Sequence, residues 1–499
     1  MYFTALDYAI VFVYLIGIAI FGIVSSGKQK STTDYFLGSK KIPWWAVCFS
    51  IVATETSTLT FISIPGLAYI TNFGFLQLAF GYIIGRIIIA YIFIPKYYKG
   101  DFETAYHYLG SRFGEPMRKY ASVTFILLRI FADGVRLFTT AIPVKFLTGW
   151  SYFECILLIG IITLIYSYIG GVKAVIWTDV LQMFIYIFAA VASVYLIYQM
   201  LPNGFQDIVS MGWDKGKFKI VDLEFKSFRE FFTGPYNLVG GLIGGAFLSM
   251  ASHGTDQLLV QRLLTCKNTK ESQKAVIGSG IIVLIQFAIF LLIGVLLFVL
   301  YKGQDFNTMS IGNYLLAKSD EIFPKFIIEN HPSGLSGIVV AGLLSASMST
   351  LASAFNSLAS TTVFDLFKKK IRKYPGKELL FSRLATLFWG IVIIGTGILF
   401  QDEKNPAVDF ALKIQSLIYG GLLGVFLMGI FNKRAKLKDA VISYSVSIFI
   451  LVLLFVLPQF KIIPALNLTW FTFFGVVISI ITGYITGLFK TTQPNNINV

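Results

Sequence analysis

Cysteine and charge are both scarce in this chain. Among its 499 residues only three are cysteines, Cys48, Cys155 and Cys266. They stand far apart in the sequence, which excludes a disulfide framework and paired cysteine ligands for zinc. Charged residues make up 13% of the chain, against 56% for hydrophobic residues. This composition excludes a soluble globular protein and indicates a membrane protein.

Histidine is equally scarce, which limits the chemistry that the chain could catalyse. His107 and His331 fall in predicted loops, and His253 lies beside Ser252 in a predicted helix. Neighbouring residues on a helix point in different directions, and the sequence suggests no third residue to complete a catalytic triad with this pair. The sequence therefore does not predict an enzyme.

Apolar runs, in contrast, are abundant. Thirteen of them reach or approach the length that spans a bilayer. They cover residues 5–25, 44–70, 73–95, 119–147, 152–170, 176–201, 236–259, 275–301, 334–364, 379–400, 407–430, 438–457 and 467–488. We expect an all-α polytopic protein of the cell membrane. The first run looks like a retained helix because no basic region precedes it.

Lysine and arginine gather in alternate loops between these runs. Examples are GKQKSTTDYFLGSKK and FKKKIRKYPGKELLFSR. Because basic loops stay in the cytoplasm, the pattern predicts that the N-terminus lies outside and the C-terminus inside. Membrane topology explains the net charge of +15 better than nucleic-acid binding does.

Two of the apolar segments contain helix breakers and polar groups. The stretch Thr54–Thr60 is almost entirely polar and is followed by Pro65 and Gly66. Five helices later, NLVGGLIGGAFLSMASHGTDQ places four glycines before Ser249. Broken helices at matching positions of two halves are typical of transporters built from inverted repeats. The alternative is a pair of kinked helices, which membranes also tolerate.

A polar stripe follows in the segment ASMSTLASAFNS. It sets Ser349, Ser353 and Ser357 four residues apart, on one face of a helix that is otherwise apolar. Such a stripe must face protein, water or an ion rather than lipid.

Five motifs in one order resemble the sodium/solute symporter family, which includes sodium/glucose, sodium/monocarboxylate and bacterial sialic acid carriers. They are the first broken helix, TDVLQ at Thr178–Gln182, DQLLVQRLL at Asp256–Leu264, STLASAFNS at Ser349–Ser357 and GVFLMGIFNKRA at Gly424–Ala435. The resemblance implies a LeuT-type core of five plus five helices in inverted repeats. The implied parts are a leading helix and inner loop (1–43), a first repeat (44–201), an outer loop (202–235), a second repeat (236–433), two trailing helices (434–490) and a disordered tail (491–499).

The resemblance also implies a main sodium site where the first core helix breaks. Its matching positions are Ala53, Thr56, Ala346, Ser349 and Thr350. All five can supply oxygen, the ligand that a hard cation prefers. The alternative for the two hydroxyl residues on the later helix is a small side chain at a tight helix crossing.

Some family members bind a second sodium with an aspartate and two serines. Asp179 and Ser353 match two of these positions, but the other serine position is Ala352. The pair could hold a second ion or guide sodium toward the cytoplasm. A hydrated structural carboxylate is the alternative for Asp179.

For the transported solute, the resemblance implies a site on the first, second, third, sixth and tenth core helices. The candidate residues are Glu55, Ser57, Thr60, Gln77, Arg129, Asp133, Arg136, Ser249, Ser252 and Gln415. Sugar-carrying members place an aromatic gate on the sixth core helix, whereas the run from Ala246 to Gln257 contains no tyrosine. This difference disfavours a sugar stacked on a ring at that point.

Charge on the third core helix has two interpretations. Arg129, Asp133 and Arg136 share one helix face, and an arginine there could bind a carboxylate bidentately. Alternatively, Glu55 and Asp133 neutralise both arginines in an internal network. Arg86 adds a further positive charge, which favours an acid or a zwitterion as the solute.

We therefore expect a sodium-coupled symporter that imports a small polar organic solute by alternating access, with a preference for a carboxylate-bearing or zwitterionic one. A sodium/sugar or polyol symporter is the alternative. A membrane sensor or channel-like protein is the alternative from another class. Sodium, the solute and the lipid bilayer are the expected partners, with no nucleic acid and a monomer as the functional unit.

Overall fold

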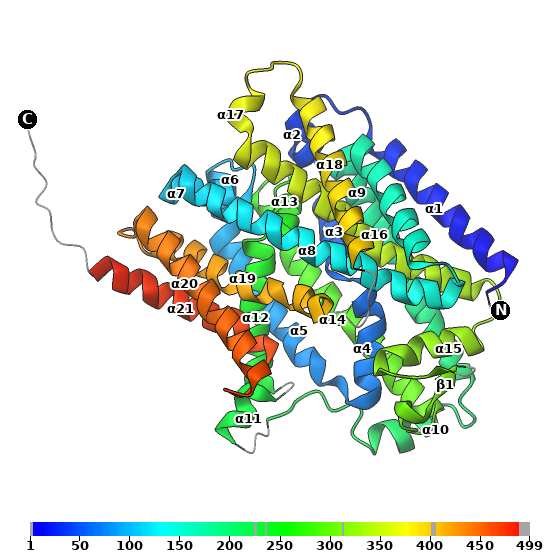
Figure 1. Cartoon of the computed structure of the whole chain (residues 1–499). Coiled ribbons are helices and arrows are strands. Elements are labelled where there is room, and N and C mark those ends of the chain that lie inside the picture. Colours follow the sequence, from blue (N-terminus) through cyan, green and yellow to red (C-terminus); the bar gives the residue numbers. More distant parts are fainter. Residues whose placement is uncertain (1–2, 224–226, 235–236, 312–313, 401–405, 489–499) are drawn as a thin grey trace, which may run out of the picture.

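The structure is a computed structural model that describes residues 3–223, 227–234, 237–311, 314–400 and 406–488. It is a bundle of helices with one short antiparallel hairpin (Figure 1). The first half contains α1 (Ala5–Ser26), α2 (Thr32–Leu37), α3 (Trp44–Glu55), α4 (Thr58–Ile70), α5 (Leu76–Ile88), α6 (Ile94–Lys99), α7 (Ala105–Phe113), α8 (Glu115–Thr148), α9 (Tyr152–Gln199), α10 (Phe205–Asp207) and α11 (Phe228–Thr233). The second half contains α12 (Leu238–Gly254), α13 (Gln257–Leu263), α14 (Thr269–Leu300), β1 (Ser310–Ile311), β2 (Tyr314–Leu315), α15 (Ile322–Asn330), α16 (Leu335–Thr361), α17 (Lys368–Ile371), α18 (Glu378–Leu399), α19 (Pro406–Phe431), α20 (Leu437–Val456) and α21 (Leu468–Leu488). The predicted disorder of residues 491–499 concerns a segment outside the described residues.

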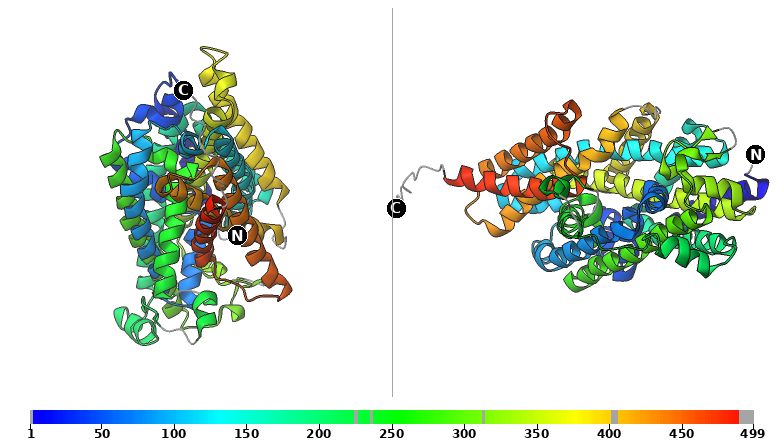
Figure 2. Two further views of the ribbon diagram at one scale, coloured as in Figure 1. Left: turned by 90° about the vertical axis from the view of Figure 1, so that its left-hand side faces the viewer. Right: turned by 90° about the horizontal axis from the view of Figure 1, so that it is seen from below.

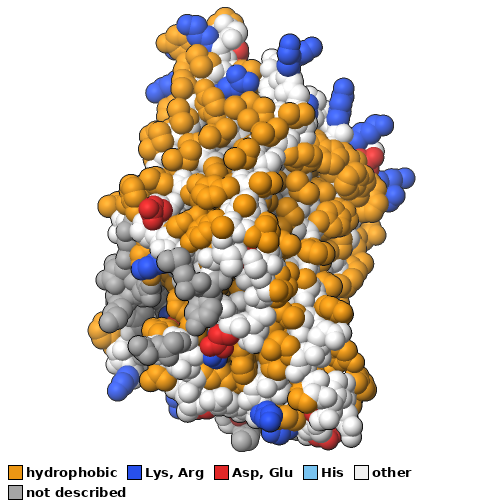
Figure 3. All heavy atoms as spheres, turned by 90° about the vertical axis from the view of Figure 1, so that its right-hand side faces the viewer, with side chains coloured by type: hydrophobic (Ala, Val, Ile, Leu, Met, Phe, Trp, Pro, Cys, Tyr) orange, Lys and Arg blue, Asp and Glu red, His pale blue; other side chains and the backbone are white. Residues whose placement is uncertain are grey.

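The chain is a multi-pass membrane protein. Within the described ranges, eight helical stretches are long and apolar enough to cross a bilayer, and the bent pair α3 and α4 would make a ninth. Large hydrophobic side chains such as Val13 and Val24 on α1 are more than two-thirds exposed. Figure 3 shows a broad hydrophobic surface on one side of the molecule, with charged side chains mainly toward its two ends. A surface this apolar requires lipid around it.

Helix α9 joins two of the predicted spans, 152–170 and 176–201, into one long element with a kink at Gly171. At this residue φ is +57°, a conformation that glycine adopts without strain. A Cβ atom there would lie 2.4 Å from the carbonyl oxygen of Tyr35. The kink therefore needs glycine both for its backbone angle and for the close approach of α2.

The first predicted break is present between α3 and α4. The two helices meet at an angle of 63°, and Thr56 and Ser57 between them have extended backbone angles. The hydroxyl of Ser57 caps α4 by accepting the N–H of Thr60 at 3.2 Å. A new cap at this point shows why the chain starts a second helix instead of continuing the first.

The glycines of α12 do not break that helix, in contrast to the sequence-based expectation. Gly241 and Gly245 lie against α5 instead, and Gly244 lies against Thr469 of α21. A Cβ at Gly245 would sit 2.3 Å from the carbonyl oxygen of Leu78. On the facing helix, a Cβ at Gly81 would sit 2.5 Å from the carbonyl oxygen of Gly241. The glycines serve close helix packing, and the chain breaks only after Gly254, before α13 begins.

The helices are arranged around α16, which is almost completely buried. In the view from below, α20 and α21 lie at one end of an elongated cross-section and α1 at the other (Figure 2). Asp7 of α1 accepts the N–H groups of Gly334 and Gly337 at 2.8 Å each, so it caps the start of α16. The central helix is thereby fixed at the end opposite to the basic loops.

The segment 202–235, which the resemblance implies is an outer loop, contains short helical pieces, and one of its lysines fixes the end of α4. Lys217 donates to the carbonyl oxygens of Tyr69 at 2.6 Å and Thr71 at 2.9 Å. Its ammonium also lies 3.9 Å from the centroid of the Phe298 ring. Burial lowers the pKa of Lys217 to about 8, with a smaller effect from the charge of Lys215.

The lowered pKa of Lys217 leads us to expect that the stability of the folded protein depends on pH. Because its pKa is lower in the folded chain than in the unfolded chain, the unfolded chain holds more protons between about pH 8 and 10. Stability therefore rises with pH across this window. We expect the melting temperature of the detergent-solubilised protein to rise between pH 8 and 10 relative to that of Lys217→Met. The exposed Lys219→Met serves as the control, and an equal response of all three proteins would contradict the assignment.

Candidate functional site

The break between α3 and α4 is attached to α16 on both of its sides. The hydroxyl of Thr350 lies 3.0 Å from the carbonyl oxygen of Thr54 and 3.2 Å from that of Ala346. On the other side, the hydroxyl of Thr58 donates to the carbonyl oxygen of Leu343 at 2.9 Å. The helix break and the hydroxyl-rich turn of α16 thus face each other directly.

The oxygen atoms at this contact suit a small cation. Ser349 is fully buried, and its hydroxyl lies beside the carboxylate of Asp179 without a well-formed hydrogen bond to any described residue. A buried hydroxyl without such a bond is costly, and a bound sodium ion would satisfy it. Ala53 and Ala346, which could contribute carbonyl oxygens, are also fully buried.

The side chain of Thr56 has other partners. Its hydroxyl donates to the carbonyl oxygen of Val52 at 3.0 Å and accepts hydrogen bonds from Gln286 and Tyr186. Only the backbone carbonyl of Thr56 can therefore serve an ion in this arrangement. Gln286 and Tyr186 did not figure in the sequence analysis, although a lone amide in the apolar run of α14 is the kind of signal that marks a buried polar contact.

A second polar cluster surrounds Asp179, one turn away from the helix break. One carboxylate oxygen accepts the hydroxyl of Ser50 at 2.5 Å and a guanidinium nitrogen of Arg262 at 3.1 Å. The same guanidinium donates to Ser50 at 2.8 Å and also to Ser353. Arg262 belongs to α13, whereas its three partners belong to α3, α9 and α16.

Arg262 therefore lies between the two side chains that the sequence offered for a second sodium, Asp179 and Ser353. Arg262 is 2% exposed, and its guanidinium supplies a positive charge where that ion would bind. From the sequence, Asp179 is a candidate for a second ion site, for an exit route or for a hydrated structural carboxylate. The carboxylate is fully buried, and its cationic partner is an arginine.

The charges of α8 form a continuous buried network. Asp133 lies between two arginines, 3.2 Å from Arg129 and 3.4 Å from Arg136. Arg129 also pairs with Asp256 at 2.5 Å, and Tyr419 donates to the same carboxylate. The acids that balance the arginines are thus Asp133 and Asp256. Tyr419 was not singled out from the sequence.

Glu55 does not neutralise the arginines of α8, as one interpretation had assumed. It forms an ion pair with the fully buried Arg86, which also donates to Ser279 at 2.7 Å. His253 approaches the same carboxylate at 3.7 Å. Arg86 is therefore compensated and no longer supports an anionic solute.

The remaining substrate candidates fall into separate places. Ser57 and Thr60 bond to each other at 3.1 Å. Gln77 lies at the start of α5, where its side-chain oxygen accepts the N–H of Asp222 at 3.1 Å. Ser249 and Ser252 lie on α12, and Ser252 contacts the ring of the neighbouring histidine at 2.8 Å. The ten candidates therefore do not form a single site.

One small cavity does bring several of them together. It is lined by Ser57, Asp133, Arg136 and Thr350, among others, and holds about 20 Å³, room for roughly one water molecule. Arg136 is the more accessible of the two arginines, with 28% of its side chain exposed against 2% for Arg129. Its guanidinium donates to Gln415 at 2.7 Å. The cavity thus joins the hydroxyl of the candidate ion site to a reachable positive charge.

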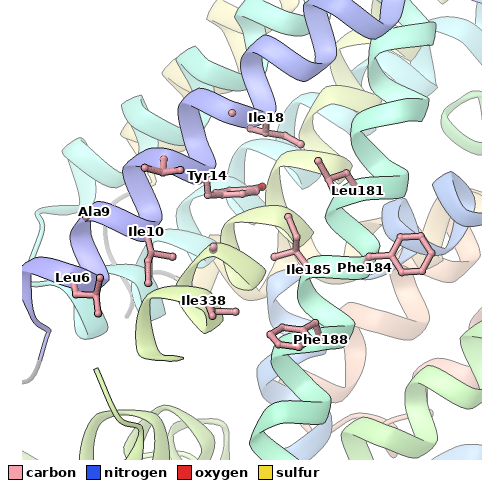
Figure 4. A pocket seen from close by; sticks show the side chains of 13 residues that line it. Leu6, Ala9, Ile10, Tyr14, Ile18, Leu181, Phe184, Ile185, Phe188 and Ile338 are labelled. Atoms are coloured by element: carbon pink, nitrogen blue, oxygen red, sulfur yellow. The ribbon is translucent and has the colours of Figure 1, made fainter. Parts of the chain in front are cut away.

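A much larger hollow of about 740 Å³ has a different character. Its wall consists of apolar side chains of α1, α9 and α16, such as Ile10, Ile185 and Ile338 (Figure 4). The hydroxyl of Tyr14 at its floor is already engaged by Ser345 at 2.8 Å. Such a surface suits lipid chains and offers a polar solute no charged group.

A broken helix joined to a buried, hydroxyl-rich helix inside a membrane bundle defines a membrane transporter of small ions and solutes. The sequence pattern of the sodium:solute symporter family matches residues 35–446. The chain therefore belongs to this family, and the resemblance is confirmed.

Named relatives agree with this assignment. The sodium/sialic acid symporter NanT of Aliivibrio fischeri is 29% identical over 99% of this chain and 95% of its own length. The sodium/glucose cotransporter of Vibrio parahaemolyticus is 28% identical over 85% of this chain and 79% of its own length. A solved structure of a Na+-coupled sialic acid symporter, in a substrate-bound outward-open state, matches with a TM-score of 0.86 and 27% identity over 98% of both chains.

Proposed function

We propose that this sodium-coupled symporter imports a small polar solute that carries a carboxylate, and that Arg136 binds this group. The observation that carries the proposal is the cavity lined by both Thr350 and Arg136. A cavity wall shared between ion and solute is what coupling requires, since each must sense whether the other is bound. The relatives named for sialic acid, which is itself a carboxylic acid, support the same choice.

For the ion, we propose that carbonyl oxygens at Ala53, Thr56 and Ala346 and the hydroxyls of Ser349 and Thr350 bind one sodium. The buried hydroxyl of Ser349, which forms no well-formed hydrogen bond to a described residue, and the two carbonyl contacts of Thr350 support this set. Because an arginine already compensates Asp179, we propose that Asp179 and Ser353 lie on the path by which sodium leaves. They would not then hold a second ion.

For the architecture, we propose the five-plus-five arrangement of inverted repeats, with thirteen spans, the N-terminus outside and the C-terminus inside. The break between α3 and α4 and the later break after α12 support two matching halves. The alternating basic loops support the orientation. A monomer as the functional unit remains a proposal as well.

The mechanism follows from differential binding. Sodium that joins α3 and α4 to α16 stabilises the outward-open arrangement, and the solute then permits closure. The ion drives transport only by the difference between its affinities for the two states. At 100 mV, one charge carried inward supplies about 2.3 kcal/mol. For a singly charged acid with one sodium this electrical part cancels, and only the sodium concentration gradient remains.

Uptake into proteoliposomes under an inward sodium gradient tests the proposal, with sialic acid, lactate and glucose as solutes. We expect accumulation of an acid, and a ten- to hundredfold higher acid concentration for half-maximal uptake in Arg136→Gln, because a charge-assisted pair is lost. Sodium should still raise the melting temperature of this variant. The exposed Arg372→Gln is the matched control.

Two results would overturn parts of this proposal separately. Accumulation of glucose alone, with no effect of Arg136→Gln, would reject the carboxylate and favour a sugar symporter. Accumulation of the true solute at the same rate when potassium replaces sodium, with no proton gradient, would reject sodium coupling itself.

A further inference from the structure

A pocket of about 800 Å³ opens where α19 passes into α20, far from the site described above. Its lining residues belong to α7, to the link between α19 and α20 and to the end of α21, and these elements lie at one edge of the bundle (Figure 1). Four basic residues line it, namely Arg112, Lys433, Arg434 and Lys436. We refer to it as the basic pocket.

Positive charge dominates the basic pocket. Its one acidic side chain, Asp439, is buried and accepts the N–H of Lys436 at 2.8 Å. Arg112 is fixed in the wall, because its guanidinium donates to the carbonyl oxygens of Gly429 at 3.2 Å and Asn432 at 2.7 Å. A preorganised arginine beside several lysines is a favourable setting for a phosphate group.

The other wall of the basic pocket is apolar. It is formed by α21, where Gly483 and Gly487 follow each other at a spacing of one turn. A Cβ atom at Gly487 would meet nothing within 4 Å. Tyr484 and Leu488 beside it are 56% and 82% exposed. The pocket therefore changes from strongly basic to apolar along its length.

We propose that the basic pocket binds an anionic membrane phospholipid, with the phosphate among the basic side chains and an acyl chain along the glycines of α21. Charge complementarity argues for an anionic headgroup, since basic pockets between membrane helices attract such lipids. The apolar wall argues for a lipid rather than a free anion, which would leave that wall unused. The inference is independent of which solute the protein carries.

Native mass spectrometry of the delipidated protein tests the proposal, with phosphatidylglycerol and phosphatidylcholine as the probes. We expect phosphatidylglycerol to bind at least about tenfold more tightly. The double variant Lys433→Gln/Lys436→Gln should bind phosphatidylglycerol about thirtyfold more weakly, because two charges near the headgroup are lost. The double variant Lys369→Gln/Lys373→Gln removes the same charge from another exposed loop and should bind as the wild type does.

A second variant tests the apolar wall without changing charge. Gly487→Leu fills open space on α21. It should weaken the binding of phosphatidylglycerol and leave the binding of inorganic phosphate unchanged. Equal binding of the two lipids, or equal losses in both double variants, would overturn the proposal. No effect of Gly487→Leu together with full displacement of lipid by inorganic phosphate would overturn it in favour of a simple anion pocket.

Discussion

Replacing Thr350 with valine should raise the sodium concentration for half-maximal uptake by at least about tenfold. Valine keeps the shape of threonine but removes the hydroxyl that lies between the carbonyls of Thr54 and Ala346. A hydrogen-bonding oxygen beside a charge contributes about 1.5–3 kcal/mol, which corresponds to a ten- to hundredfold change. The measurement is solute uptake into proteoliposomes over a range of sodium concentrations.

Two further variants make this result specific. Thr350→Ser keeps the hydroxyl and should restore most of the sodium affinity. Ser357→Ala removes a hydroxyl of the same stripe that already donates to the carbonyl of Ala354, so its sodium dependence should match that of the wild type. An unchanged half-saturation in Thr350→Val would remove this residue from the ion site.

Replacing Arg262 with glutamine should destabilise the protein in the absence of sodium and make its stability strongly dependent on sodium. Removing one partner of a buried ion pair leaves an uncompensated charge, which costs about 3–5 kcal/mol. In this variant the carboxylate of Asp179 would be the uncompensated group. We expect sodium to take the place of the lost guanidinium, so that the ion raises the melting temperature of Arg262→Gln more than that of the wild type.

The double variant Asp179→Asn/Arg262→Gln is the matched control, because it removes both charges together. Its response to sodium should return to the wild-type size. In the wild-type protein, one sodium ion should accompany each solute, so that transport of a singly charged acid carries no net charge. If Arg262→Gln responds to sodium no more than the wild type does, arginine and sodium do not compete for this carboxylate.

The positions of the helices could be predicted because they depend on local sequence. An apolar run of sufficient length forms a helix in a bilayer wherever it occurs, and the polar stretch after Thr54 marks the break between α3 and α4. The glycines of α12 were misread because the same residue type can break a helix or permit close packing. Only the presence of α5 on that face decides between the two.

The pairing of charges could not be predicted in the same way. Glu55 pairs with Arg86 and not with an arginine of α8, because the fold brings the end of α3 within reach of the Arg86 side chain on α5. Arg262 reaches Asp179 only because the chain turns at Thr255 and Asp256 before α13 begins. Such contacts depend on the angles between helices, which the order of residues along one helix does not specify.

The glycine contact between α5 and α12 has a mechanical consequence. Backbone lies against backbone at the glycines of this crossing, where the nearest atoms include the carbonyl oxygens of Leu78, Gly241 and Ala246. We expect α5 and α12 to move together as one rigid body while the protein exposes the bound solute first to one side of the membrane and then to the other. The bending would then be concentrated in the short non-helical links at Thr56–Ser57 and Thr255–Asp256.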